Sequence, residues 1–327
     1  MTQSVRQSSH ALSEPRISIA VVIPAYRVAP FIMDVITQIP TEVDHIIVVD
    51  DASPDNLQEV LRQITDPRLI VLRHPVNRGV GGAMKTGLSK ALDLQADIVV
   101  KIDGDGQMDP QLISQFVAPI IAGHSDMTKG NRFALVALVR QMPLIRRLGN
   151  VALSFLTKLA SGYWHVFDPC NGYLALRSSL LRELDFHRLE ERYFFEISLL
   201  CEAYFVRAVL EDIPMAPVYN HESSSLRPWR MIADFTPRLL GRVGYRLGMS
   251  YLLRDFNAVS LLLVTGLPTL SFGVAWSLYH WIHAARFQIL TSTGTVMIGV
   301  LAIVLGFQLL LQALVLDVSN EPGRSRR

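Results

Sequence analysis

Apolar and polar positions alternate in blocks along the N-terminal part of the chain. Four short runs rich in valine and isoleucine have the pattern of strands that are buried on both faces of a parallel sheet. These runs are Ile17–Pro24, His45–Val49, Leu69–Leu72 and Ile98–Ile102. Stretches with helical periodicity follow the first three, at about residues 30–39, 57–64 and 79–92. This order predicts a doubly wound α/β fold with a mostly parallel sheet, whose ligand lies at the carboxyl ends of the strands.

Beyond Asp109 the alternation is weaker. An amphipathic stretch runs from Leu135 to Leu159, a strand-like run from Gly172 to Leu176, and a helical stretch from about Phe195 to Tyr204. These patterns fix the elements less well, so they place candidate residues only approximately.

Two long stretches near the C-terminus carry no charged residue. No Asp, Glu, Lys or Arg occurs between Asp255 and Arg286, or between Arg286 and Asp317. A helix that crosses a bilayer needs about 20 mostly apolar residues, and Ala258–Ile282 and Thr295–Leu316 are long enough. We therefore expect two transmembrane helices; the alternative is a very apolar helical bundle.

A basic amphipathic segment precedes these stretches. Thr236-Pro237 is typical of a helix start, and the arginines and apolar residues around it form neighbouring stripes that suit a helix among lipid headgroups. The stripes are Arg238, Arg242 and Arg246, and Phe235, Leu239, Val243 and Leu247. The expected segments are a flexible N-terminus (1–15), a folded domain (16–228), juxtamembrane amphipathic helices (229–257), two transmembrane helices (258–318) and a basic tail (319–327).

The distribution of charge is more informative than its sum. A formal net charge of +2 does not favour nucleic acid as a partner. Arginines flank the two apolar stretches, with only Arg286 between them. This predicts a multi-pass protein of the cell (inner) membrane whose folded domain and termini are cytoplasmic. The first 15 residues lack the apolar core of a signal peptide, and Cys170 and Cys201 have neither disulfide nor zinc spacing.

Asp103-Gly104-Asp105-Gly106-Gln107 directly follows the fourth predicted strand. Two carboxylates separated by a glycine can face one side and bind a hard divalent cation, Mg²⁺ or Mn²⁺, whose shell is completed by substrate phosphates. Such a cation acts as a Lewis acid on a departing diphosphate. An EF-hand loop is excluded, because Met108 and Ser114 stand where that loop needs glycine and glutamate. The alternative is a solvated acidic turn.

Asp50-Asp51-Ala52-Ser53 ends the second predicted strand. Alone it is ordinary turn chemistry, but at the same sheet edge as the Asp103 motif it predicts a nucleotide pocket. The glycine-rich stretch after Asn77 is no Walker loop, since Met84 replaces the glycine required before Lys85. It is either a helix cap with glycines for close packing, or a helix N-terminus that faces a phosphate together with Lys85.

Three further polar residues lie in the second part of the domain. Asp168 precedes Pro169 on a loop and is a candidate general base or acceptor-orienting group, with an Asx turn as the plain alternative. Glu196, in an aromatic stretch, would be costly to bury without a partner and is a candidate for the same crevice. Arg132 is a candidate for a diphosphate contact.

At these residues the sequence resembles the family 2 glycosyltransferases of the GT-A fold, and among them the polyprenyl-phosphate (dolichyl-phosphate mannose or glucose synthase-like) group. The resemblance runs from about Ile17 to Leu226 and rests on six segments. They are Pro24-Ala-Tyr26, Asp50-Asp51-Ala-Ser53, Asn77-Arg-Gly79, Asp103-Gly-Asp105-Gly-Gln107, Gly130-Asn-Arg132 and Asp168-Pro-Cys-Asn-Gly172.

The resemblance implies an inverting, metal-dependent hexosyl transfer. The nucleoside would lie against Pro24, Tyr26 and Asp51, and the metal diphosphate against Asp103, Asp105 and Gln107. The expected nucleotide-sugar-binding residues are Pro24, Tyr26, Asp50, Asp51, Asn77, Lys85, Asp103, Gly104 and Arg132. The expected catalytic residues are Asp105, Asp168 and Glu196, and the expected metal ligands are Asp103, Asp105 and Gln107.

Two segments depart from the pattern of this family. Arg27-Val28 replaces the usual Asn-Glu, so a nucleoside contact from that glutamate is lost. Residues 219–226 replace an arginine-glycine-x-serine-lysine segment. Ser225, Arg227 and Arg230 are the candidates for the acceptor phosphate.

The preferred hypothesis is sugar transfer from a nucleotide-sugar to polyprenyl phosphate. An acceptor phosphate is already ionised, so Asp168 would orient or balance charge. One alternative transfers the sugar to a hydroxyl of a lipid-linked saccharide or other glycolipid, which needs Asp168 or another carboxylate as a base. Another is a non-catalytic nucleotide-binding membrane scaffold, which the retained carboxylates disfavour. Homo-oligomerisation through the apolar helices is a further expectation.

Overall fold

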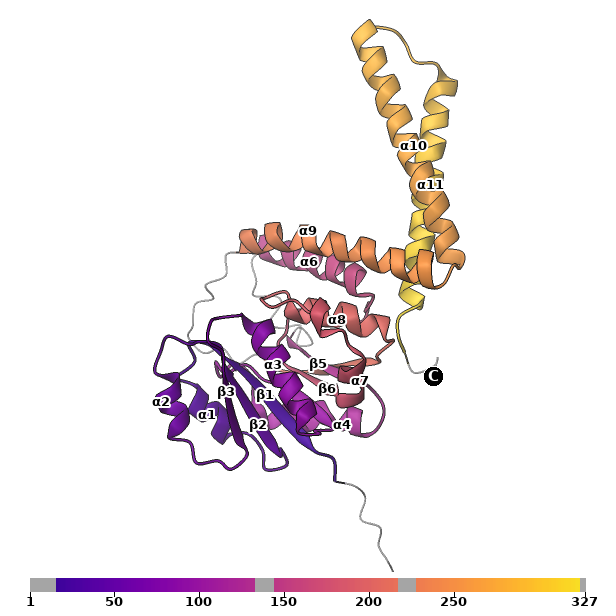
Figure 1. Ribbon diagram of the computed structural model, residues 1–327. Helices are drawn as coiled ribbons and strands as arrows, with labels where there is room; N and C mark the ends of the chain where they lie inside the picture. The colour runs from indigo at the N-terminus through magenta and orange to yellow at the C-terminus, as the bar shows by residue number, and fades with distance from the viewer. Residues whose placement is uncertain (1–15, 133–143, 217–227, 324–327) are drawn as a thin grey trace, which may run out of the picture.

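The computed structural model describes residues 16–132, 144–216 and 228–323 (Figure 1). Its centre is a seven-stranded sheet with the order β3-β2-β1-β4-β6-β5-β7. The strands are β1 (Ile19–Ala25), β2 (His45–Asp50), β3 (Leu69–Arg73), β4 (Ile98–Lys101), β5 (Met127–Asn131), β6 (Leu174–Arg177) and β7 (Leu210–Pro214). The four valine- and isoleucine-rich runs are all strands, as is the run that ends at Leu176. The sequence pattern did not predict β5 and β7.

The sheet is mostly parallel. β1 pairs in parallel with β2 and β4, β2 with β3, and β5 with β7, whereas β6 runs antiparallel to β4 and β5. The expected fold class is therefore confirmed. The chain builds outward from β1 through β2 and β3 and then returns to add β4 on the other side. Ligands of open α/β sheets bind where the strand order reverses in this way, here between β1 and β4.

Helices cover both faces of this sheet (Figure 1). Alternate side chains of β1 point to opposite faces, so Ile23 joins a core with Phe116 of α4, while Val22 joins a core with Met84 of α3 and Leu199 of α8. α1 and α2 cover the first face with α4, and α7 covers the second. These helices are α1 (Ile32–Thr37), α2 (Leu57–Arg62), α3 (Val80–Asp93), α4 (Ile113–Ile121), α7 (Ser178–Glu183) and α8 (Phe195–Phe205).

Two longer helices, α6 (Leu144–Ser161) and α9 (Pro228–Leu247), lie together over α8 (Figure 1). α9 begins at Pro228, so the expected helix start at Thr236-Pro237 is wrong and Pro237 lies inside the helix. A proline there removes one backbone hydrogen bond. Phe235 and Leu239, on either side of it, are buried against α8, and we attribute the tolerance of the proline to this packing.

The apolar stripe of α9 contacts protein rather than lipid. Phe235 and Leu239 pack on Phe194 and other residues of the α6 and α8 surface. Arg242, on the neighbouring stripe, lies 3.0 Å from a carboxylate of α8. The apolar stripe is therefore covered by α8 and α6, whereas Arg238 of the arginine stripe has a side chain that is 54% exposed. Leu240, which is 55% exposed, lies on the uncovered side of α9.

The C-terminal helices form a hairpin that projects away from the sheet (Figure 1). A π-helical segment, η4 (Gly248–Arg254), joins α9 to α10 (Ala258–Phe287), and α11 (Thr293–Ser319) returns beside it. Both helices are long and apolar enough to cross a membrane, and only 22% and 17% of their apolar windows are buried within the protein. Such low burial is unlike that of core helices, so the structure does not support the alternative of an apolar bundle.

Candidate active site

The carboxyl ends of β1, β2 and β4 bring the predicted residues to one edge of the sheet. Ala25 of β1 lies opposite Asp50 of β2, and Val22 of β1 lies opposite Lys101 of β4. The chain leaves β4 two residues before Asp103, at the level where β1 ends. The Asp50 turn and the Asp103 motif therefore flank the loop that carries Tyr26, whose side chain is 42% exposed.

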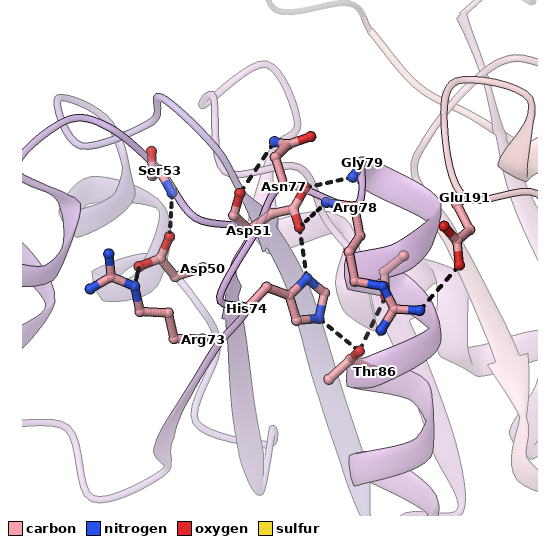
Figure 2. Close-up of polar contacts among 11 residues, drawn as sticks. Asp50, Asp51, Ser53, Arg73, His74, Asn77, Arg78, Gly79, Thr86 and Glu191 are labelled. Carbon is pink, nitrogen blue, oxygen red and sulfur yellow. Dashed lines mark hydrogen bonds and ion pairs between the residues drawn. The ribbon is translucent and has the colours of Figure 1, made fainter.

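Asp51 is held inside a closed set of hydrogen bonds (Figure 2). One carboxylate oxygen accepts from the Nδ1 of His74 (2.7 Å) and the backbone N–H of Arg78 (2.8 Å), and the other accepts from the backbone N–H of Gly79 (2.7 Å). The Nδ2 of Asn77 donates to the carbonyl of Asp51 (3.2 Å). Asp51 is only 3% exposed. Its carboxylate thus caps the segment that begins α3.

Asp50 and Ser53 tie the loops after β1 and β2 together. An oxygen of Asp50 accepts from the backbone N–H of Ser53 (2.8 Å), and Arg73 lies 3.5 Å from the other oxygen (Figure 2). The hydroxyl of Ser53 accepts from the backbone N–H of Arg27 (2.7 Å) and donates to Asp55 (2.5 Å). These contacts hold the turn that presents Tyr26.

The glycines at the start of α3 allow a neighbouring segment to pack closely. A Cβ at Gly81 would overlap the carbonyl of Glu190, and the backbone N–H of Gly82 donates to the carbonyl of Glu191 (3.0 Å). The structure therefore shows the close packing that was one of the two interpretations. Lys85 lies further along α3 and lines a surface cavity of about 540 Å³ between this helix and residues 186–191.

Asp103 has a buried lysine as its counter-ion. The Nζ of Lys101 lies 2.6 Å from an oxygen of Asp103 and 3.2 Å from an oxygen of Glu196. The Lys101 side chain is 1% exposed, whereas that of Asp103 is 31% exposed. Burial alone would lower the pKa of Lys101, but the two carboxylates outweigh it and raise that pKa. Glu196 thereby has the partner that its burial requires.

Lys101 was missed in the sequence, although a signal was present. It stands inside the apolar run of β4, between two other strands, where a lysine is almost never buried unless it is paired. A search for its partner would have pointed to Asp103 and Glu196. Gly172 closes this cluster, because a Cβ there would come within 2.5 Å of both Asp103 and Lys101.

Asp105 and Gln107 form a turn beside this cluster. The backbone N–H of Gln107 donates to a carboxylate oxygen of Asp105 (3.0 Å), and both residues are at least partly exposed. Within the described residues no group of three or more His, Cys, Asp or Glu side chains surrounds a common point. Two carboxylates and an amide still fit Mg²⁺, which binds proteins through one or two carboxylates and takes its other ligands from substrate phosphates and water.

Asp168 forms a bidentate ion pair with Arg132. Its oxygens lie 2.7 Å from Nε and 3.1 Å from Nη2 of Arg132, and Asp168 is 2% exposed. Asn171 also donates to Asp168 (3.4 Å), and its carbonyl accepts from the buried Nζ of Lys129. Burial lowers the pKa of Lys129. The loop of residues 168–172 therefore connects the Arg132 pair to the Asp103 cluster.

The predicted residues fall into three groups. The structure gathers Asp103 and Glu196 around Lys101, with Asp105 and Gln107 in the turn that follows Asp103, and joins Arg132 to Asp168. Asp50, Asp51 and Asn77 form the neighbouring turn, and Lys85 lies apart from both. Ser225 and Arg227 lie outside the described residues. Arg230 lies in the first turns of α9.

The chain is similar in sequence to known glycosyltransferases. The sequence profile of Glycosyl transferase family 2 matches residues 20–185. Over 220 residues the chain is 32% identical to the UDP-N-acetylglucosamine--dolichyl-phosphate N-acetylglucosaminyltransferase of Methanococcus voltae, covering 63% of this chain and 87% of that protein. It is 28% identical over 163 residues to the polyprenol monophosphomannose synthase of Mycolicibacterium smegmatis, covering 49% of this chain and 61% of that protein.

Solved structures show a similar fold. The glucosyl-3-phosphoglycerate synthase of Mycobacterium tuberculosis superposes with a TM-score of 0.53 at 23% identity, over 71% of this chain and 80% of that chain. At this level of identity the likeness concerns the fold alone.

Proposed function

The chain belongs to glycosyl transferase family 2, and from that premise we propose that it transfers a sugar from a nucleotide-sugar to a polyprenyl phosphate, with inversion at the anomeric carbon and with Mg²⁺ or Mn²⁺. The observation that carries the proposal is the 32% identity to a dolichyl-phosphate sugar transferase across 87% of that relative.

The donor would lie at the strand edge between β1 and β4. We assign the nucleoside to the loops that carry Pro24, Tyr26 and the Asp50–Ser53 turn, with Asp51 and Asn77 holding the shape of that turn. Gly104 follows Asp103 where a Cβ would crowd Ile32 and Val28. Its lack of a side chain therefore lets the turn after Asp103 pack closely on the core.

Asp103, Asp105 and Gln107 would hold the divalent cation. When bound, such a cation neutralises the diphosphate leaving group as a Lewis acid. Lys101 fixes the Asp103 carboxylate at 2.6 Å and adds a positive charge beneath it. Glu196 balances that charge from α8 at 3.2 Å. In this arrangement Glu196 acts through Lys101 and Asp103 rather than by contact with the sugar.

Asp168 suits an orienting role better than that of a base. Its two oxygens already accept from Arg132, and the Asp168 side chain is buried whereas that of Arg132 is partly exposed. Such a fork-like pair fixes the guanidinium for a phosphate contact. A lipid phosphate is largely ionised at neutral pH, since its second pKa is about 6, so it attacks without a base. A hydroxyl acceptor would need a carboxylate with a proton-accepting position, and this pairing disfavours Asp168 in that role.

The same proposal extends to the membrane. We propose that residues 16–228 are the catalytic domain, that α10 and α11 cross the bilayer, and that both termini and the domain are cytoplasmic, as the arginine distribution indicates. Glu196 lies on α8, and α6 and α9 lie over α8 on the side from which the hairpin leaves (Figure 1). The site is thus one helix layer away from the helices that would face the lipid.

A donor and acceptor screen tests this function. The full chain is purified in lipid nanodiscs and incubated with UDP- and GDP-sugars and either polyprenyl phosphate or the free polyprenol. We expect nucleoside diphosphate release and a glycolipid with polyprenyl phosphate only, loss of both with EDTA, and recovery with Mn²⁺. NMR of the product reports the anomeric configuration. Turnover with polyprenol, or full activity in EDTA, would overturn the respective part of the proposal.

A further inference from the structure

The last turn of α11 carries a buried carboxylate, which is the one charged side chain of this helix. Asp317 is 3% exposed. Its oxygens accept from Nη1 and Nη2 of Arg246 (2.8 Å each), the hydroxyl of Tyr251 (2.5 Å) and the Nε1 of Trp164 (3.1 Å). Each oxygen accepts two hydrogen bonds, which is the full capacity of a carboxylate.

The four donor groups come from three different parts of the molecule. Trp164 follows α6, Arg246 lies in the last turn of α9, and Tyr251 lies in η4. Arg246 also donates to the carbonyl of Leu159 in α6 (3.0 Å). The end of the hairpin is therefore bonded to α9, and is linked to α6 through Arg246 and through Trp164.

The chain beyond Asp317 adds contacts of the same kind. The backbone carbonyl of Asn320 accepts from Arg207 (2.9 Å), a residue that follows α8. Glu321 pairs with His165, next to Trp164. Three of these partners, Trp164, His165 and Arg207, belong to the folded domain itself.

Anchoring does not require this cluster. Two apolar helices of this length hold a protein in a bilayer without help, and an ionised group near a span is costly unless it is paired. A buried ion pair is also weak evidence for stability, since apolar replacements of similar volume are often neutral. What a fully hydrogen-bonded, bidentate pair adds is a fixed direction.

We propose that Asp317 is a positioning residue which, through Arg246, Tyr251 and Trp164, fixes the orientation of the catalytic domain on the membrane hairpin. The contacts run from α11 to α9 and to Trp164 after α6, from α9 and α6 to α8, and from Glu196 of α8 to Lys101 and Asp103. The junction would hold the Asp103 cluster at the height of a lipid phosphate. This role rests on the proposed function, because it concerns an acceptor that lies in the bilayer.

The first test compares a membrane acceptor with a soluble one. Asp317→Asn keeps the volume and removes the charge, and Asp255→Asn is the matched control because Asp255 is exposed at the same end of the hairpin. We expect Asp317→Asn to lose about 10- to 100-fold in kcat/KM with long-chain polyprenyl phosphate in nanodiscs. With a short, water-soluble prenyl phosphate in detergent, and in the KM for the donor, it should match the control.

A double variant separates positioning from folding. Arg246→Met with Asp317→Leu replaces the pair by apolar groups, which restores packing without a directional bond. We expect it to unfold at a temperature near that of the wild type and to show the same selective loss as Asp317→Asn. Equal losses with both acceptors in both variants would mean a structural role only, and no loss with either acceptor would mean no role; either result overturns the proposal.

A distance measurement tests the junction without any reaction. Spin labels are placed at exposed positions Arg62 in α2 and Leu290 in the hairpin loop, in a chain whose Cys170 is replaced by serine. The proposal expects one narrow distance distribution for the parent and a broad one for Asp317→Asn. Narrow distributions in both would refute it. If the protein transfers sugar to neither acceptor but the distance distributions differ as expected, the proposed function is wrong and the positioning role of Asp317 is retained.

Discussion

Two aspartates, Asp51 and Asp103, lie at the same edge of the sheet and differ in the groups that surround them. Asp51, after β2, is 3% exposed, and backbone N–H groups and His74 occupy its carboxylate. Asp103, after β4, has a side chain that is 31% exposed, with one oxygen against the Nζ of buried Lys101. Both follow apolar strands and both resemble ligand-binding motifs.

The difference shows that the role of a carboxylate at the end of a strand depends on the groups that contact it. Backbone N–H groups and His74 hold the Asp51 carboxylate against the start of α3, which is a structural role. The Nζ of Lys101 fixes one oxygen of Asp103, and the partly exposed side chain stays open to a cation that carries a diphosphate. The following variants, from the largest expected effect to the smallest, test this division.

Asp105→Asn should have the largest effect. It removes one of two carboxylates proposed to hold the cation, whose contribution of several kcal/mol corresponds to about a 10³-fold loss in kcat/KM. The unfolding temperature should change little, because Asp105 is partly exposed. Electron paramagnetic resonance of Mn²⁺ with nucleoside diphosphate should show weaker binding. Asp34→Asn, on the exposed side of α1, is the control; a Mn²⁺ affinity equal to that control would remove Asp105 from the site.

Lys101→Met should come next and act on stability as well as activity. It leaves Asp103 and Glu196 facing each other without a cation, and breaking a buried pair costs about 3–5 kcal/mol. Thermal unfolding in detergent measures this. Adding Glu196→Gln should recover part of the unfolding temperature, because it removes one of the two facing charges. Lys90→Met on α3 is the control, and an unfolding temperature like that of the control would show that Lys101 is not the counter-ion.

Asp51→Asn should destabilise the protein without acting on the chemistry. Hydrogen bonds to a charged group contribute about 1.5–3 kcal/mol each, and part of that is lost when the acceptor becomes neutral. We expect a lower unfolding temperature, and a kcat and donor KM within about threefold of the wild type at a temperature where the variant is folded. A tenfold rise in donor KM with unchanged unfolding would instead assign Asp51 to direct nucleoside contact.

Arg73→Ala should have the smallest effect. Arg73 lies 3.5 Å from Asp50, but its side chain is 51% exposed, and exposed ion pairs contribute about 0–1 kcal/mol. Its unfolding temperature should match that of Arg62→Ala, an arginine exposed on α2. A loss comparable to that of Asp51→Asn would contradict the view that burial separates the partners that matter from those that do not.

The sequence identified those residues of the candidate site that stand in a motif next to one predicted strand or helix. The Asp103 motif was located because it follows an unmistakable buried strand, and the structure places it at the expected edge. Lys101, His74 and Lys129 were missed, since none stands in a motif and each has a partner far away in the chain, respectively Glu196, Asp51 and Asn171. The predicted start of α9 was too late, because packing on α8 outweighs the preference of Pro237 for the first turn of a helix.

The sequence by itself determined the strand runs, the order of the motifs and two helices long enough to span a membrane. Those features depend on periodicity and length within one element, which local composition dictates. Only the tertiary structure decided that α3 closes on Asp51, that α9 packs on protein, and that Arg246 meets Asp317, 71 residues away. The reason is physical: burial can be seen in the pattern of one element, but a polar partner is chosen by which distant elements pack together.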